Sequence, residues 1–310
     1  MKKNNERRLF FDIETTGLSP EVSAITLIGC LDDHGLIKQW FNEDGFSQKQ
    51  ILTDFFAYCN SYDTLISFNG TTFDLPFLKA KAKEFQMNDP FSMIHHEDFY
   101  QKLRSYRHLI DTQRFRQKDL EQYVHFQRKD RLSGKKIIKT YQDFLKTNDP
   151  TCKEKILLHN EEDLKGLFKI SSLQCYPSLK EGNFSVDQVK RSCDYLQVFL
   201  TLSDPFPVSA TFTKKEISLK VENNFASLIV PIKNHMLRHY YPNPKDYFYL
   251  PKEDTILPKS MGSFVDHSSK TACDFDHCYL RFAPSDSFLS NMDELHTFST
   301  HTIQYLFIKE

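Results

Sequence analysis

The chain has 310 residues, 40% of them hydrophobic, which is enough for one large domain or two ordinary ones with a sizeable core. It contains no run of 18 apolar residues, and its charged start lacks the apolar segment of a secretory signal, so we expect neither a membrane span nor secretion. The formal net charge of −1 neither indicates nor excludes a nucleic-acid partner, which is recognised by local basic surface. Seven scattered cysteines argue against a disulfide framework and predict a cytoplasmic location.

Three strands are predicted at the start of the chain. Residues 9–13 form a short apolar run that ends in acidic residues, which is typical of a buried strand. Residues 24–31 and 36–41 are rich in apolar side chains, and the turn-forming residues 32–35 separate them. We therefore expect the second and third strands to pair as a hairpin.

Helices and strands then alternate. Ser47 and Gln50 have the spacing of a capping box, and apolar residues recur at helical spacing after them. A strand at 64–68 and a helix from Asp74 to about Phe85, with Pro76 in its first turn, are expected next. A fifth strand is expected at Leu109 and Ile110. A second capping box, Thr151 and Glu154, is expected to begin a helix that runs to about Leu173. This order predicts an α/β domain over residues 1–176, with a mixed sheet flanked by helices.

The remaining residues predict a second, smaller α+β unit, rich in strands, over 183–310. Residues 177–183 are interpreted as a linker, and Ser185 and Gln188 are expected to cap a helix that runs to Phe199. Residues 217–221 alternate between apolar and polar side chains, as in a half-buried strand. Asn223 and Asn224 would then form a tight hairpin turn before a return strand over 225–230.

Two carboxylates interrupt the first predicted strand. Asp12 and Glu14 lie on the same side of it, because side chains alternate along a strand. Neighbouring carboxylates repel each other unless a cation lies between them, and Mg²⁺ and Mn²⁺ prefer such oxygen ligands. Gly17 permits a tight turn close by. A metal site is one interpretation, and a strand that runs into a turn is the other.

Two further segments have a charged residue at a position where the hydrophobic pattern predicts a buried apolar one. Asp74 follows a strand and a glycine-containing loop and begins a helix, although an ordinary N-cap explains it equally well. In the long helix, His159 and Asp163 share one face with apolar residues at 156, 167 and 170. A satisfied core histidine would be unremarkable there, but an unpaired buried aspartate would be very costly.

In this order, the three places resemble the motifs of the DEDD exonuclease superfamily: Asp12-x-Glu14, then Asn69-Gly-x-x-Phe-Asp74, then His159-x-x-x-Asp163. More narrowly, Asp111-Thr-Gln-Arg, the run Arg128–Gly134, Tyr141 and the last helix resemble the YprB-like ribonuclease-H-like domains of bacteria. The resemblance covers about residues 7–175 and implies a ribonuclease-H-like fold and a metal-dependent 3′-5′ exonuclease. One position departs: the superfamily has Tyr four residues before the last Asp or His five before it, whereas this chain has His159 and Leu158 there.

The resemblance also implies roles for these residues. The carboxylates of Asp12, Glu14, Asp74 and Asp163 would hold two divalent ions, Mg²⁺ or Mn²⁺, about 4 Å apart. Asp12 would bridge the ions, Glu14 and Asp163 would complete one site, and Asp74 would help the other. His159 would orient or deprotonate the attacking water, or only hydrogen-bond the scissile phosphate.

The expected partner is DNA or RNA, single-stranded or with a 3′ end. The expected contacts to it are Thr15, Asn69, Phe73, Lys135 and Lys136. The last two belong to the basic stretch 129–139, and 104–118 is basic as well, although either stretch alone is more often a solvated face.

Other interpretations remain open. The tyrosines at 240, 241, 247 and 249 can stack on bases, but a small core is the favoured reading. His267, Cys273, His277 and Cys278 have the chemistry of zinc ligands, but their spacing fits no closed site, so we interpret them as loop residues. Alternative functions are a structure-selective endonuclease on the same fold, a non-catalytic nucleic-acid-binding module and a scaffold protein.

Overall fold

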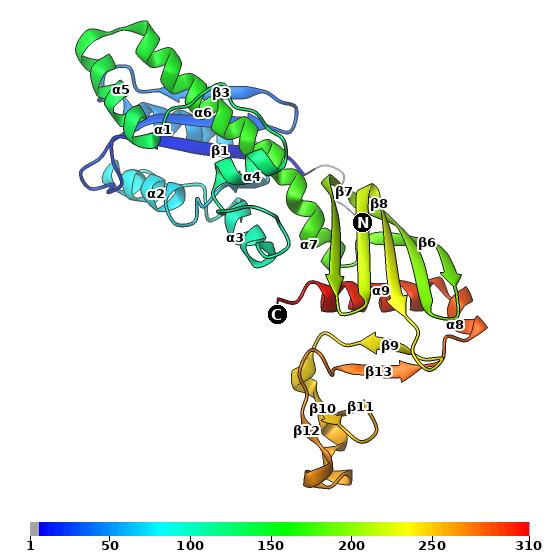
Figure 1. Cartoon of the computed structure of the whole chain (residues 1–310). Coiled ribbons are helices and arrows are strands. Elements are labelled where there is room, and N and C mark those ends of the chain that lie inside the picture. The colour runs from blue at the N-terminus through cyan, green and yellow to red at the C-terminus, as the bar shows by residue number, and fades with distance from the viewer. Residues whose placement is uncertain (1–5, 310) are drawn as a thin grey trace. The chain divides into compact units, whose positions relative to one another are not determined.

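The computed structural model describes residues 6–309, which form two compact units (Figure 1). Of these residues, unit 1 contains 6–107 and 111–171, and unit 2 contains 108–110 and 172–309. Among the described residues, no helix is both long and apolar enough to cross a membrane. All seven cysteines lie in this part of the chain, and each is a free thiol.

Unit 1 is built on a five-stranded mixed sheet in the order β3-β2-β1-β4-β5. Its strands are β1 (Arg8–Thr15), β2 (Ile25–Asp32), β3 (Ile37–Phe41), β4 (Thr64–Ser67) and β5 (His95–Asp98). The first three are antiparallel neighbours, while β4 pairs parallel with β1 and β5 pairs parallel with β4. The predicted mixed sheet and the β2–β3 hairpin are therefore confirmed.

Helices cover both faces of this sheet (Figure 1). They are α1 (Gln48–Cys59), α2 (Asp74–Glu84), α3 (Phe99–Leu103), α4 (Gln117–Tyr123), α5 (Gly134–Thr147) and α6 (Pro150–Ile170), with a 3₁₀ turn η1 (Arg104–Tyr106). Buried residues of β1 at positions 9, 11 and 13 pack with α1 and α2 in one core cluster. The alternate residues of β1 face α6, where Phe10 contacts Phe168 with ring centroids 5.3 Å apart. The period-two pattern thus places Asp12 and Glu14 on the α6 side.

A glycine in β2 lets α6 approach the sheet closely. Gly29 pairs with Asp12 on β1 and with Gln39 on β3, so these three residues form one row across the sheet. Asn160 of α6 lies over that row, accepts a hydrogen bond from Gln39 (2.9 Å) and donates one to Asp12 Oδ2 (2.9 Å). A Cβ at Gly29 would stand 1.8 Å from Asn160 Oδ1, so only glycine leaves room for this bridge.

Three local predictions for the first 176 residues were wrong. The fifth strand is β5 rather than residues 109–110, because β5 is a polar edge strand (His-His-Glu-Asp) without an apolar signal. Ser47 is the N-cap residue of α1, but its hydroxyl donates to Asp44 Oδ2 (2.7 Å) and no capping box forms.

The start of the last helix also differs from the prediction. The N-cap of α6 is Asp149, which accepts from the amide of Thr151 (2.9 Å), and Pro150 occupies the first turn. The helix ends at Ile170, and the 3₁₀ turn η2 (Ser171–Gln174) follows it.

Unit 2 is rich in strands, as predicted. Its largest sheet is β6 (Phe184–Arg191), β7 (Tyr195–Lys214) and β8 (Ile217–Pro231), all antiparallel. Smaller sheets pair β9 (Leu237–Tyr240) with β13 (Tyr279–Phe282), and β10 (Tyr247–Leu250) with β11 (Thr255–Pro258) and β12 (Thr271–Ala272). The helices are α7 (Cys175–Lys180), α8 (Asp286–Ser290) and α9 (Met292–Leu306), with 3₁₀ turns η3 (Pro244–Asp246), η4 (Lys259–Phe264) and η5 (His267–Ser269).

The local predictions failed more often in unit 2. Residues 177–183 are no linker, because α7 buries residues 175–179. The predicted helix over 185–199 is instead the hairpin β6–β7, whose buried residues from 196 to 202 alternate. The strand over 217–221 is confirmed. Asn223-Asn224 is not a turn, because β8 continues through it. Asn223 has a positive φ, and it lies where the facing strand β7 carries extra, unpaired residues.

The close approach at Gly29 generates a stability prediction. We expect Gly29→Ala to destabilise unit 1 by about 1–3 kcal/mol, because the added methyl must displace Asn160 from its bridge. Trp40 of β3 is the only tryptophan of the chain, so its fluorescence during urea unfolding reports on unit 1. Gly134→Ala is the matched control, since nothing lies within 4 Å of a Cβ there. Equal unfolding midpoints for the two variants would contradict the prediction.

Candidate functional site

Four carboxylates and one imidazole, contributed by three elements, converge in unit 1. Strand β1 carries Asp12 and Glu14, and α6 carries His159 and Asp163 one turn apart. Asp74 is the first residue of α2, and its side chain is only 6% exposed. The N-cap position of α2 is Phe73, so the N-cap interpretation of Asp74 was wrong.

Three of these side chains come close enough to share one ion. His159 Nε2 lies 3.3 Å from Asp163 Oδ2 and 3.7 Å from Glu14 Oε1. Ligand atoms of the three residues all lie within 4.8 Å of one another. The donor set is two carboxylates and one imidazole, which suits a divalent cation such as Mn²⁺, while the neighbouring carboxylates of Asp12 and Asp74 add the oxygen donors that Mg²⁺ prefers.

The loop that brings Asp74 to this place is held by Asp98, the N-cap residue of α3. The Asp98 carboxylate accepts hydrogen bonds from the amides of Asn69 (2.9 Å) and Thr71 (3.0 Å) as well as from the first turn of α3. A Cβ at Gly70 would stand 2.2 Å from Ser67 Oγ and 3.4 Å from Asp74 Oδ2, so the glycine allows the loop to pass close to the carboxylate. Asn69 has a positive φ of 65°, which asparagine tolerates better than most residues.

A second loop holds the α6 side of the site. Arg128 forms two-pronged hydrogen bonds with Glu121 of α4 and also pairs with Asp163 Oδ1 at 2.5 Å. Next in sequence, the amides of Lys129 and Asp130 donate to the two carboxylate oxygens of Glu162 (2.9 and 2.6 Å). The loop therefore fixes consecutive acidic residues of α6, and Arg128 leaves Asp163 Oδ2 turned toward His159.

The same loop also fixes the histidine. Asp130 Oδ2 lies 2.5 Å from His159 Nδ1. Burial alone would raise the pKa of Asp130, but hydrogen bonds from the Leu132 amide and His159 outweigh it and lower the pKa. An ionised Asp130 accepts the Nδ1 proton, and Nε2 is the nitrogen that faces Glu14 and Asp163.

Sequence reasoning assigned no role to Glu121, Arg128, Asp130 or Glu162. The signal available for them was the run Arg128–Gly134, which carried the family resemblance but has no periodicity that predicts contacts. Its geometry depends on α4 and α6 packing together, and a Cβ at Gly166 of α6 would stand 2.0 Å from Glu121 Oε1. The hydrogen bonds of these four residues join positions up to 35 apart, which local patterns do not predict.

The carboxylates of the site oppose one another's ionisation. Burial and repulsion from Asp163, Asp74 and Glu14 raise the pKa of Asp12 well above its usual value. Burial, followed by Asp163 and Asp74, raises the pKa of Glu14 in the same way. Burial, with repulsion from Asp98 and Asp163, raises the pKa of Asp74 to about 7. A bound divalent cation would remove this repulsion, so the residues fit such an ion.

The predicted nucleic-acid contacts lie in different environments. Thr15 donates its hydroxyl to the carbonyl of Gly17 (2.7 Å) directly after the acidic pair of β1. Asn69 is in the loop held by Asp98, and Phe73 packs partly against the core cluster of α1 and α2. Lys135 and Lys136 are exposed in the first turn of α5.

The suggested zinc ligands lie in unit 2. His277 Nδ1 pairs with Asp274 at 2.8 Å, and Cys278 is buried. Within residues 6–309, the group of His, Cys, Asp and Glu side chains close enough to share an ion is Glu14, His159 and Asp163.

The raised pKa of Asp74 predicts a pH-dependent stability without metal. A carboxyl group whose pKa rises from 3.8 to about 7 on folding stabilises the fold while it is protonated, and that stability is lost as the pH rises through 7. Asp74→Asn should therefore gain stability over the wild type in chelator, and the gain should grow by about 2–3 kcal/mol between about pH 5 and pH 8. Urea unfolding followed by Trp40 fluorescence measures it. The exposed Asp54→Asn should show no such trend, and a pH-independent gain at position 74 would contradict the predicted titration.

The family model of the RNase_H superfamily matches residues 9–174, the segment that contains every residue of the site. No curated protein matches the chain. Among solved structures, the family B DNA polymerase of the hyperthermophilic archaeon Pyrobaculum calidifontis is similar with a TM-score of 0.49 and 11% identity, over 98% of this chain and 46% of the polymerase chain. This chain thus spans less than half of the length of that polymerase. Because the family match covers more than half of the 310 residues, the chain belongs to the RNase_H superfamily.

Proposed function

We propose that the chain is a metal-dependent nuclease that hydrolyses phosphodiester bonds as a 3′-5′ exonuclease, and that it is related to the YprB-like domains of bacteria. The observation that carries the proposal is the cluster of Glu14, His159 and Asp163 within 4.8 Å, beside Asp12 and Asp74, two carboxyl groups with raised pKa values. Strongly perturbed carboxyl groups gathered at one place are typical of catalytic sites. Membership of the RNase_H superfamily supports a nucleic-acid substrate.

The proposed ligands follow from motif position and agree with the geometry. Asp12 would serve both of two divalent ions, Mg²⁺ or Mn²⁺, while Glu14 and Asp163 would complete one site and Asp74 would serve the other. The bound ions supply positive charge at the scissile phosphate and lower the pKa of a water. Asn160 orients the Asp12 carboxylate by donating to Oδ2 at 2.9 Å, and Arg128 orients Asp163 by its contact with Oδ1.

His159 is the proposed base, and Asp130 is the residue that positions it. With Nδ1 held by Asp130, His159 presents Nε2 to the space bounded by Glu14 and Asp163, where it accepts a proton from the attacking water or orients that water. The superfamily's last motif has a tyrosine four residues before the aspartate or a histidine five before it. Here the histidine, His159, lies four residues before Asp163, and the Asp130 carboxylate holds its ring. Asp130 is thus expected to act through His159 and not on the substrate.

The first test is metal-dependent cleavage by the purified chain. End-labelled single-stranded DNA and RNA are incubated with Mg²⁺, Mn²⁺ or chelator, and we expect a ladder that shortens from the 3′ end and requires metal. Asp12→Asn should lower the rate by roughly 10²–10³-fold or more, while the exposed Asp54→Asn should cleave like the wild type. Internal cuts in place of a ladder would favour the endonuclease alternative. No cleavage by a folded, metal-loaded wild type would refute the nuclease proposal.

A second test addresses the role of Asp130. Asp130→Asn keeps the side-chain shape but removes the charge that holds the Nδ1 proton, so we expect kcat to fall about 10–100-fold with little change in KM. NMR of ¹⁵N-histidine-labelled protein should show the Nδ1-protonated form of His159 in the wild type and its loss in the variant. An unchanged tautomer together with a reduced kcat would rule out this positioning role.

A further inference from the structure

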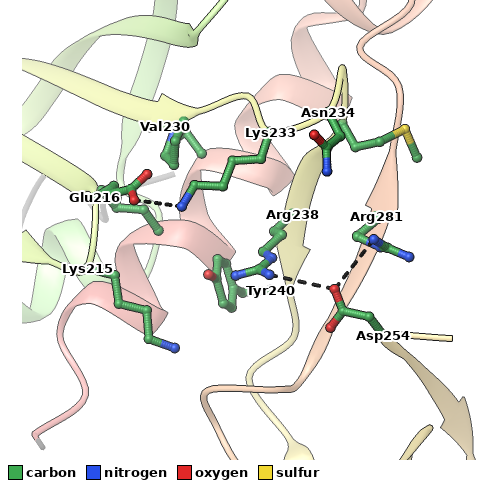
Figure 2. Close-up of a pocket in the computed structure, with 12 residues that line it drawn as sticks. Lys215, Glu216, Val230, Lys233, Asn234, Arg238, Tyr240, Asp254 and Arg281 are labelled. Atoms are coloured by element: carbon green, nitrogen blue, oxygen red, sulfur yellow. Dashed lines mark hydrogen bonds and ion pairs between the residues drawn. The ribbon is translucent and has the colours of Figure 1, made fainter. Parts of the chain in front are cut away.

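Unit 2 contains a cavity of about 200 Å³ with an excess of positive charge (Figure 2). Four cationic side chains line it: Lys215, Lys233, Arg238 and Arg281. Two anionic side chains, Glu216 and Asp254, also line it, so the lining carries a formal excess of two positive charges. The cations come from the β7–β8 turn, the turn after β8, and strands β9 and β13.

The cavity results from the curvature of the long β7–β8 hairpin. Ile217 begins β8 and Val230 lies at its other end, yet both line the same cavity. Between the pairs Thr201–Phe225 and Ala210–Val221, β7 carries extra residues that β8 lacks. Such bulges bend a strand and increase its twist, which brings the two ends of the hairpin together. The ion pair of Lys233 with Glu216 (2.6 Å) closes this curve.

The two arginines are fixed in place around Asp254. Asp254 Oδ1 accepts the hydroxyls of Tyr249 (2.9 Å) and Tyr279, while Oδ2 faces Arg238 at 3.6 Å and Arg281 at 3.5 Å. Burial alone would raise the pKa of Asp254, but these tyrosines and arginines outweigh it and lower the pKa. The ionised carboxylate therefore anchors both guanidinium groups.

Neither arginine is saturated by this anchor. Separations of 3.5–3.6 Å are ion pairs that are too long for hydrogen bonds, so the N–H groups that face Asp254 keep donor capacity. Arg238 is held over the Tyr279 ring, 4.3 Å from its centroid, and Arg281 donates to the carbonyl of Glu253 (2.9 Å). Two guanidinium groups, held at ion-pair distance from Asp254 and by these neutral contacts, form a pre-organised site for phosphate oxygens, which they bind as bidentate donors.

We propose that this cavity binds a backbone phosphate of a nucleic-acid strand, which makes unit 2 a substrate-binding unit. The inference rests on the nuclease function proposed above. Exposure favours a strand over a small phosphorylated ligand, because the four cationic side chains remain 38–58% exposed. Small-ligand sites enclose most of their ligand, whereas single strands are bound along open basic grooves. Lys215, which pairs with Asp276 at 3.5 Å, and Lys233, which pairs with Glu216, are the most exposed of the four and add positive charge to the cavity.

Binding of short fluorescent single-stranded DNA and RNA to the full chain, in chelator to prevent cleavage, tests this proposal. For Arg281→Gln/Lys215→Gln we expect Kd to rise roughly tenfold at low salt and the slope of log Kd against log salt to decrease by about 1. Lys190→Gln/Lys220→Gln is the matched control, because it removes two exposed lysines of β6 and β8 that lie outside the cavity. If replacement of Arg281 unfolds unit 2, Lys215→Gln/Lys233→Gln tests the same site through its most exposed cations.

Two results would overturn the proposal. The first is equal affinity of the cavity and control variants for both oligonucleotides. The second is a cavity variant that loses affinity for inorganic phosphate or a mononucleotide but not for the oligonucleotides, which would assign the site to a small ligand. The cleavage assay keeps the two proposals separate: a wild type that cleaves but binds independently of the cavity refutes only this inference. A wild type that binds through the cavity but never cleaves refutes only the nuclease proposal.

Discussion

Repulsion among the carboxylates between β1, α2 and α6 is the constraint around which unit 1 is organised. Burial and mutual repulsion raise the pKa values of Asp12, Glu14 and Asp74 together, so the metal-free site opposes folding at neutral pH. The surrounding contacts orient these groups more than they neutralise them. Asn160, for example, holds Asp12 through an amide, which fixes the carboxylate without removing its charge. A site built only for stability would contain an apolar side chain or a matched ion pair here.

Neutralisation is concentrated on the helix side of the site. Arg128 pairs with Glu121 and Asp163, and Asp130 holds His159. One irregular loop therefore fixes the two site residues of α6, His159 and Asp163. Asp12 and Asp74 lie on the sheet and on α2, where a divalent cation would have the largest effect on charge. Gly29 makes the arrangement possible, because it lets Asn160 cross β2 to reach β1. The site thus depends on a glycine whose only contribution is space.

The features predicted from the sequence are those with a local cause. Alternation along β1 placed Asp12 and Glu14 on one side, and helical spacing placed His159 and Asp163 on one face. The features that were missed depend on distant contacts. Strand β5 is polar because it is an edge strand, and the positive φ of Asn223 lies within β8, opposite the extra residues of β7, and not in a hairpin turn. Asp130 lies in a loop without periodicity, so only the packing of α4 and α6 brings it to His159.

The near-zero net charge of the chain conceals two opposite local fields. Unit 1 gathers carboxylates that a divalent cation would neutralise, and unit 2 gathers cations around a cavity that an anion would neutralise. In both places neutral contacts help to hold the charged side chains: an amide holds Asp12, and the face of Tyr279 holds Arg238 beside its ion pair with Asp254. The metal ions that accompany a phosphodiester would complement the carboxylates of unit 1, and its phosphate would complement the cations of unit 2. Composition alone therefore cannot exclude a nucleic-acid partner, because recognition depends on where the charges are fixed and not on their sum.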